Sequence, residues 1–203
     1  MSKEKIYIFD TTLRDGAQTQ GVDFSLNEKE KIAKSLDNLG VDYIEGGWPG
    51  ANPTDTEFFN KDQNFKNANL TAFGMTKKSE HSAKNDPMLS SLINSKSSSV
   101  CLFGKSWDFH VDVALGISND QNLENISESA KHIVNSGKEF MFDAEHFFDG
   151  YKSNPEYAIS CLKAAYDNGA RWIVLCDTNG GTLPHEISKI VEEVTKHIPG
   201  KNL

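Results

Sequence analysis

The chain has 203 residues, 37% of them hydrophobic and 25% charged, which suits one globular domain with a buried core. Its 21 Lys and Arg stand against 29 Asp and Glu, giving a net charge of −8, and no basic cluster provides a nucleic-acid footprint. No apolar run approaches the roughly 18 residues of a membrane-spanning helix. We therefore expect neither a nucleic-acid nor a membrane partner.

Apolar runs of strand length recur along the chain and alternate with segments of helical periodicity. The predicted strands are residues 6–9, 43–45, 70–73, 100–103, 140–142 and 172–176. We take the first of these to be a buried strand.

The clearest helix is predicted to begin at Ser25, which has capping-box spacing with Glu28, and to end at Gly40. Its predicted buried face is made of Ile32, Ala33, Leu36 and Leu39. The same periodicity, with Gly or Pro as stop signals, predicts further helices within residues 123–135, 154–169 and 187–199.

Strands that alternate with helices predict a parallel sheet built from βαβ units. One repeat takes about 33 residues, close to the roughly 31 residues per unit of a TIM (β/α)8 barrel. The competing doubly wound sheet is disfavoured because the first strand–helix turn lacks the G-x-G-x-x-G fingerprint. We predict an α/β TIM-type barrel of which residues 1–203 hold the first six βα units. We expect strands 7 and 8 and any C-terminal domains to be absent.

Polar residues gather where four of the predicted strands end, which is the edge at which parallel α/β proteins carry their chemistry. The groups are Asp10, Arg14, Asp15 and Gln18 after the first strand, Glu45 in the second, Asp143, Glu145 and His146 after the fifth, and Asp177, Thr178 and Asn179 after the sixth. Together they indicate a functional rim, although any one of them alone is a weak signal.

Each group also has a purely structural interpretation. Arg14 and Asp15 are compatible with a surface turn or an ion pair, and Glu45 with an interior carboxylate held by neighbouring donors. Asp177 and Thr178 are compatible with the start of a turn that Gly180 and Gly181 complete.

The fifth strand and the remaining histidines also carry structural expectations. Strand alternation places Asp143 and Glu145 on one face and His146 on the other. The other five histidines look isolated, and we expect them to be surface or helix residues: His81, His110, His132, His185 and His197.

The sequence contains no P-loop, no G-x-S-x-G elbow and no Cys/His zinc spacing. The rim instead offers hard oxygen ligands, one guanidinium group and one hydroxyl group. This inventory suits a divalent cation chelated by a small oxo-acid, with Arg14 balancing oxyanion charge.

Four segments resemble a known family: DTTLRDGAQTQGVDFS, YIEGGWPGANPTDTEFF, FDAEHFFDGYKSNPEYA and LCDTNGGTLPHEI. They are similar to the metal-dependent acyltransferases that comprise the citramalate, isopropylmalate and homocitrate synthases, of the DRE-TIM metallolyase type. The resemblance runs from residue 5 to 200. T-L-R-D-G marks the superfamily, whereas the two longer central segments favour the citramalate branch.

The resemblance implies condensation of acetyl-CoA with pyruvate to give citramalate and free CoA, on a route to isoleucine. It implies a divalent metal (Mg, Mn or Zn) bound by Asp15, and an enolate-stabilising Arg14 that contacts the keto acid. Thr178 would contact the keto-acid carboxylate, Gln18 would belong to the substrate site, and Glu145 would be a catalytic residue and a candidate base.

The chain departs from the family pattern at the metal site. The family's two further metal ligands form an H-x-H motif on strand 7, and none of the six histidines here stands two residues from another. We therefore expect an incomplete metal site and little or no synthase activity from this chain. We also expect the full-length protein to be a homodimer.

Three alternatives stay open. The first keeps the class and changes the keto acid, as in isopropylmalate or homocitrate synthase, and the second is a carbon–carbon lyase of the same superfamily. The third is a short, non-catalytic paralogue that acts as a binding or assembly partner.

Cysteine usage and the N-terminus bear on the compartment. Cys101, Cys161 and Cys176 are scattered and odd in number, which is typical of reduced, buried thiols. The four-residue apolar run at 6–9 is too short for a signal peptide. Both observations favour a cytoplasmic protein.

Overall fold

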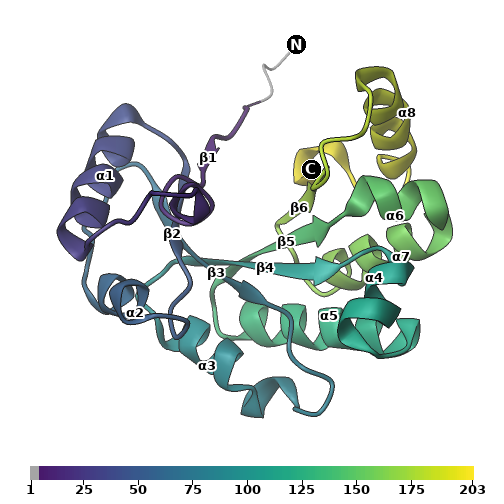
Figure 1. The fold of residues 1–203 in the computed structure, drawn as a ribbon, viewed down its shortest axis with the longest axis horizontal. Helices are drawn as coiled ribbons and strands as arrows, with labels where there is room; N and C mark the ends of the chain where they lie inside the picture. Colours follow the sequence, from purple (N-terminus) through teal and green to yellow (C-terminus); the bar gives the residue numbers. More distant parts are fainter. Residues whose placement is uncertain (1–4) are drawn as a thin grey trace. The chain divides into compact units, whose positions relative to one another are not determined.

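The computed structural model describes residues 5–203 (Figure 1). The chain divides into two compact units, which are described separately. Unit 1 comprises the residues up to Gly74 together with Ser91–Val100, and unit 2 comprises Met75–Ser90 together with Cys101–Leu203. Within residues 5–203, no helix combines the length and the apolar character needed to cross a membrane.

Unit 1 holds strands β1 (Phe9–Asp10), β2 (Tyr43–Gly47) and most of β3 (Asn69–Met75). β1 pairs in parallel with β2, and β2 with β3. Helices α1 (Leu26–Leu39) and α2 (Pro53–Asn60) pack on each other and on β2. The core of this unit is made of Ala33, Ile44, Phe58, Phe59, Ala72 and Leu92, all at most 1% exposed.

Unit 2 holds most of β4 (Ser99–Lys105) and the parallel pair β5 (Glu139–Glu145) and β6 (Trp172–Leu175). Its main helices are α5 (Asn119–Asn135), α6 (Phe147–Ser153), α7 (Pro155–Tyr166) and α8 (Pro184–Val194). α7 packs against α5, α6 and both paired strands (Figure 1). The core includes Ile126, Ile133, Phe142, Ala158 and Leu162, all fully buried.

Shorter elements complete the chain. They are the helices α3 (Pro87–Asn94) and α4 (Asp108–His110), the π-helix η3 (Val111–Leu115), and the 3-10 turns η1 (Gly16–Gln18), η2 (Ala83–Asn85) and η4 (Gly200–Asn202). Sequence reasoning did not single out α2, α3 or α6, because each is eight residues or fewer and offers too few turns for a periodic signal.

In each unit, strands that are consecutive in the chain are neighbours in the sheet, and they are parallel. Unit 1 runs β1-β2-β3, with the start of β4 beside β3 through the bond from Ser98 N to Leu70 O. Unit 2 continues with β4 beside β5, through the bond from Ser106 N to Glu145 O, and then β6. This order is the one that a barrel requires, because a doubly wound sheet reverses its order at a switch point.

The prediction of a buried first strand is wrong for most of its length. Ile6 is 83% exposed and Ile8 is 53% exposed, and only Phe9–Asp10 is paired as a strand. β1 is an edge strand that pairs with β2 in the described part of the chain, so one neighbour is too few to bury a whole apolar run.

The first helix is predicted correctly at both ends and wrongly on one face. Ser25 and Glu28 form the full capping box, and Gly40 closes the helix with φ 89°. Leu39, however, is 77% exposed, while Asp37 is buried in its place. The Asp37 carboxylate accepts main-chain N–H bonds from residues 66–68, which compensates for its burial.

Candidate functional site

The loop that follows β1 is wound into a tight turn around one carbonyl group. Thr11 O accepts N–H bonds from Arg14, Asp15 and Gly16 at 2.9–3.2 Å. The Asp10 carboxylate accepts the N–H of Thr12 at 3.0 Å and stiffens the entry to the turn. The Asp and Thr residues of this loop therefore have a structural purpose, which is to hold the backbone of Arg14 and Asp15 in one conformation.

The Arg14 guanidinium group is held on several sides. Its Nε donates to Glu45 Oε2 at 2.5 Å, and its NH1 group donates to Asp15 Oδ1 at 3.0 Å. The guanidinium carbon lies 3.9 Å from the centroid of the Phe73 ring. Glu45 is fully buried on β2, whereas the Asp15 side chain is 64% exposed. The ion pair and the buried, donor-held carboxylate expected from the sequence are thus both present, and they share one arginine.

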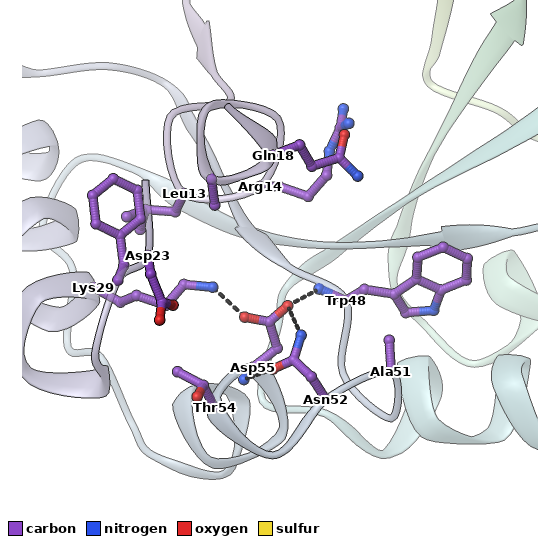
Figure 2. Close-up of a pocket in the computed structure, with 12 residues that line it drawn as sticks. Leu13, Arg14, Gln18, Asp23, Lys29, Trp48, Ala51, Asn52, Thr54 and Asp55 are labelled. Atoms are coloured by element: carbon purple, nitrogen blue, oxygen red, sulfur yellow. Dashed lines mark hydrogen bonds and ion pairs between the residues drawn. The ribbon is translucent and has the colours of Figure 1, made fainter. Parts of the chain in front are cut away.

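A pocket of about 430 Å³ lies beside this loop in unit 1 (Figure 2). Arg14 and Gln18 line it from the loop after β1, and Lys29 lines it from α1. Trp48, Asn52 and Asp55 line it from the loop after β2 and the start of α2.

Asp55 organises the far wall of this pocket. Its carboxylate accepts bonds from the Lys29 ammonium group, from Trp48 N at 2.8 Å and from Asn52 Nδ2 at 2.9 Å (Figure 2). Gly47 has φ 133°, and a Cβ atom there would lie 2.5 Å from Asp55 Cγ, so this position requires glycine. Sequence reasoning missed the pair of Lys29 and Asp55, because a long separation along the chain hides an ion pair that forms only on folding.

In unit 2, Glu145 ends β5 and is held at both its side chain and its main chain. The Lys105 ammonium group pairs with its carboxylate. Ser106 donates to the Glu145 carbonyl oxygen from Oγ at 2.7 Å and from N at 3.3 Å. Asp143 and Glu145 are both partly exposed while Ala144 is buried, as strand alternation predicts. Sequence reasoning missed Lys105, although it ends the fourth strand at the same kind of position.

Thr178 lies in the turn after β6, and its hydroxyl oxygen accepts the N–H of His146 at 2.9 Å. Asp177 starts this turn, as predicted: its carbonyl oxygen accepts the N–H of Gly180 at 2.8 Å, and its carboxylate accepts bonds from both N and Oγ of Thr182. Burial opposes the charge on Asp177, but the bonds from Thr182, together with the charge of Lys152 and the N–H of Gly181, outweigh it and lower the pKa of the carboxyl group.

Two expectations about histidines are wrong. His146 does not continue the strand alternation, because it lies outside β5 in a left-handed conformation with φ 54°. His110 is not isolated, because its ring stacks 4.7 Å from Trp107 and meets the His146 ring edge-on at 4.5 Å. Burial, followed by the charges of His146 and Lys105, lowers the pKa of His110. The sequence gives no signal for this pair because 36 residues separate its members.

The residues predicted for the site fall into two groups. Arg14, Asp15 and Gln18 come together in unit 1, in the loop after β1. Glu145 and Thr178 belong to unit 2. Glu145 precedes His146 in the chain, and the Thr178 hydroxyl group accepts the N–H of His146. None of the three cysteines forms a disulfide; Cys101 and Cys161 are buried and Cys176 is partly exposed.

Consecutive parallel strands with polar residues at their carboxyl ends are characteristic of α/β proteins of the barrel type. HMG-CoA lyase from Bacillus subtilis has the same fold, with a TM-score of 0.80 and 17% identity over 97% of this chain and 66% of that chain. The protein is therefore an α/β protein of the TIM-barrel class. A family model described as HMGL-like matches residues 5–203, and the chain belongs to that family.

Sequence relatives refine this assignment. The chain is 54% identical to (R)-citramalate synthase from Aquifex aeolicus, over 98% of this chain and 38% of that protein. Five relatives with that name share 44–54% identity with it. It is 34% identical to 2-isopropylmalate synthase from Shouchella clausii, over 96% of this chain and 37% of that protein. The chain thus spans less than two fifths of the length of these relatives.

Proposed function

We propose that this chain is part of an acyltransferase that condenses acetyl-CoA with pyruvate to form citramalate. The observation that carries the proposal is the 54% identity, over 98% of the chain, to a relative named (R)-citramalate synthase. The 430 Å³ pocket beside Arg14 supports a small-molecule substrate, since ligand pockets usually measure about 300–1,000 Å³.

Arg14 is the residue best prepared for this chemistry. Carbon–carbon bond formation turns the pyruvate carbonyl oxygen into an oxyanion, and a fixed cationic donor stabilises that charge without having to reorganise. Its contacts with Glu45, Asp15 and Phe73 fix the guanidinium group before any substrate binds.

Asp15 is the proposed metal ligand. Its exposed carboxylate is the hard oxygen donor that Mg²⁺, Mn²⁺ or Zn²⁺ accepts, so its chemistry fits the role, although one carboxylate is not a full ligand set. A divalent cation bound there would supply Lewis-acid polarisation of the keto group.

Glu145 and Thr178 complete the proposed machinery, with Gln18 as a further substrate contact. Thr178 would donate a hydrogen bond from its hydroxyl group to the keto-acid carboxylate. Glu145 is the candidate base for the methyl proton of acetyl-CoA. The methyl carbon then bonds to the pyruvate carbonyl carbon, and water cleaves the thioester to release citramalate and the CoA thiol.

The proposal extends to the setting of the chain. Residues 1–203 would form the N-terminal part of a catalytic barrel, in a protein that is a homodimer when full-length. Three cysteines that remain thiols support a reducing, cytoplasmic compartment.

The test is a thiol-release assay on the 203-residue chain and, if the reading frame continues past Leu203, on the longer product. We expect CoA release with acetyl-CoA and pyruvate from the longer product, and little or none from the chain alone. The principal alternative is 2-isopropylmalate synthase, because a relative of that name is 34% identical to the chain. A clear preference for 2-oxoisovalerate over pyruvate would favour the alternative and overturn the citramalate assignment.

A further inference from the structure

The turn at the end of β5 has a backbone conformation that calls for an explanation. Among residues 5–203, only Asn64 and His146 combine a side chain with a positive φ, at 50° and 54°. Glycine would adopt this conformation at lower cost, so the presence of a histidine indicates that its ring contributes something. Asn64 is exposed, whereas the His146 side chain is 14% exposed.

The left-handed turn directs the His146 N–H group toward Thr178, whose hydroxyl oxygen accepts it at 2.9 Å. A hydroxyl group has one proton and two acceptor positions. Since this bond uses an acceptor position, the proton of Thr178 stays available for a different partner. The main-chain bond therefore orients Thr178 as a hydrogen-bond donor.

The His146 ring belongs to a hydrogen-bond network that leads back to the chain neighbour of Thr178. Its Nδ1 lies 3.2 Å from Asp149 Oδ2, and the same oxygen accepts a bond from Asn179 Nδ2 at 2.9 Å. Because Asn179 directly follows Thr178 in the chain, the network links both the main chain and the ring of His146 to the same turn. It connects the end of β5, the first turn of α6 and the end of β6 within unit 2.

Aromatic packing fixes the ring from a further side. The His110 ring meets the His146 ring edge-on at 4.5 Å, and the Trp107 ring lies 6.1 Å away. The ring is thus held by a carboxylate and by an aromatic neighbour and has little freedom to turn.

We propose that His146 is a positioning residue that, through its left-handed N–H and its Asp149-anchored ring, holds the Thr178 hydroxyl group ready to donate to the keto-acid carboxylate. This rests on the proposed function for the identity of the acceptor. The hydrogen-bond network itself does not depend on that function.

The first experiment measures hydrogen exchange of the His146 amide in the ¹⁵N-labelled 203-residue chain. Thr178→Val removes the hydroxyl group at nearly constant shape, and we expect exchange of this amide to become about tenfold faster. Thr178→Ser restores the acceptor and should restore slow exchange. Unchanged exchange in Thr178→Val would overturn the proposal.

The second experiment follows the χ1 rotamer of Thr178 by three-bond couplings. His146→Gly keeps the turn, because glycine adopts the left-handed conformation readily, and removes the ring, so we expect averaging between rotamers at Thr178. Asn64→Gly, the matched left-handed control, should leave Thr178 in one rotamer. A single fixed rotamer in His146→Gly would contradict a positioning role for the ring.

The third experiment titrates pyruvate at about 10 mM Mg²⁺, well above the weak affinity expected of the partial metal site, and monitors the Thr178 methyl signal. We expect a response in the wild type and in Asn64→Gly, and about fivefold weaker binding in His146→Gly, the loss expected for one ordered hydrogen bond. Equal affinity in His146→Gly and the wild type would refute the proposal. No response in the wild type would count against the proposed function, while the first two experiments still decide the role of His146.

Discussion

At the scale of single residues, Arg14 and Glu45 form an enclosed ion pair in the candidate site. Glu45 is fully buried, and the Arg14 side chain is 16% exposed. Burying two charges is costly, and well-packed apolar residues in their place are often as stable or more so. If the pair adds little to stability, its position beside the pocket supports the role proposed for the Arg14 guanidinium group in the chemistry of the site.

Variants of this pair test that explanation. Glu45→Met leaves Arg14 without its buried partner, so we expect the free energy of unfolding to fall by about 3 kcal/mol. The double variant Arg14→Met with Glu45→Met removes both charges and should lie within about 1 kcal/mol of the wild type. Urea unfolding measures both. If the double variant is as unstable as Glu45→Met, the ion pair itself stabilises the folded protein.

We expect His110 to make the stability of the protein depend on pH near neutrality. Because the folded state lowers the pKa of His110 below 6.5, the unfolded chain binds more protons in that range. The free energy of unfolding should therefore fall as the pH drops through 6.5 toward the lowered pKa. Four charged or titratable groups act on the pKa of His110: His146 and Lys105 lower it, and Glu145 and Asp149 raise it.

His110→Phe keeps an aromatic ring in the stack and removes the titrating group. Within residues 5–203, His110 Nδ1 is buried without a hydrogen-bond partner, so the variant should also gain about 1 kcal/mol at neutral pH. We expect its unfolding free energy to vary less between about pH 7.5 and 5.5 than that of the wild type. His185→Gln, on an exposed histidine, should keep the wild-type slope. An unchanged slope in His110→Phe would assign the pH dependence to another group.

At the scale of elements, α1 is held to the segment after β2 by one buried ion pair. Lys29 and Asp55 are 3% and 8% exposed, and Asp55 also accepts the Trp48 N–H that shapes the loop. Helix caps define where α1 begins and ends, but this pair and Asp37 decide which residues of the helix face inward.

Lys29→Met tests this attachment. The variant keeps the aliphatic stem and leaves the Asp55 carboxylate without its ammonium partner, so we expect a loss of about 3 kcal/mol in unfolding free energy. Lys31→Met, on an exposed position of the same helix, should change it by less than about 0.5 kcal/mol. Similar losses in both variants would show that helix propensity, and not the ion pair, is responsible.

At the scale of the whole molecule, metal affinity reports how much of a cation site the chain contains. Asp15 is the single metal ligand that the family resemblance assigns within residues 1–203. We expect Mn²⁺ to bind with a Kd of about 10⁻⁴ M or weaker, the range of sites with few charged ligands. Titration calorimetry measures this, with Asp15→Asn as the control. A micromolar Kd that Asp15→Asn abolishes would contradict the expected incomplete site.

The sequence predicted the class of fold because the evidence for it is local. The capping box at Ser25, the stop at Gly40 and the strand–helix period near 33 residues depend on neighbours along the chain, and all have counterparts in the structure. The exposure of Leu39 and Ile8 was not predictable, since both fit an apolar pattern and only the packing around them decides what is covered.

The candidate site likewise combines features that the sequence predicts with contacts that form only on folding. Hydrophobic periodicity and capping act over a few residues, so the sequence alone was enough to predict the α/β class, both ends of α1 and the position of polar residues at the ends of strands. The tertiary structure alone decided that Glu45 and Phe73 hold Arg14, that Lys29 pairs with Asp55, and that His110 meets His146. These contacts join residues that are distant in the sequence. They form on folding because a buried charge or hydrogen-bond donor without a partner costs free energy.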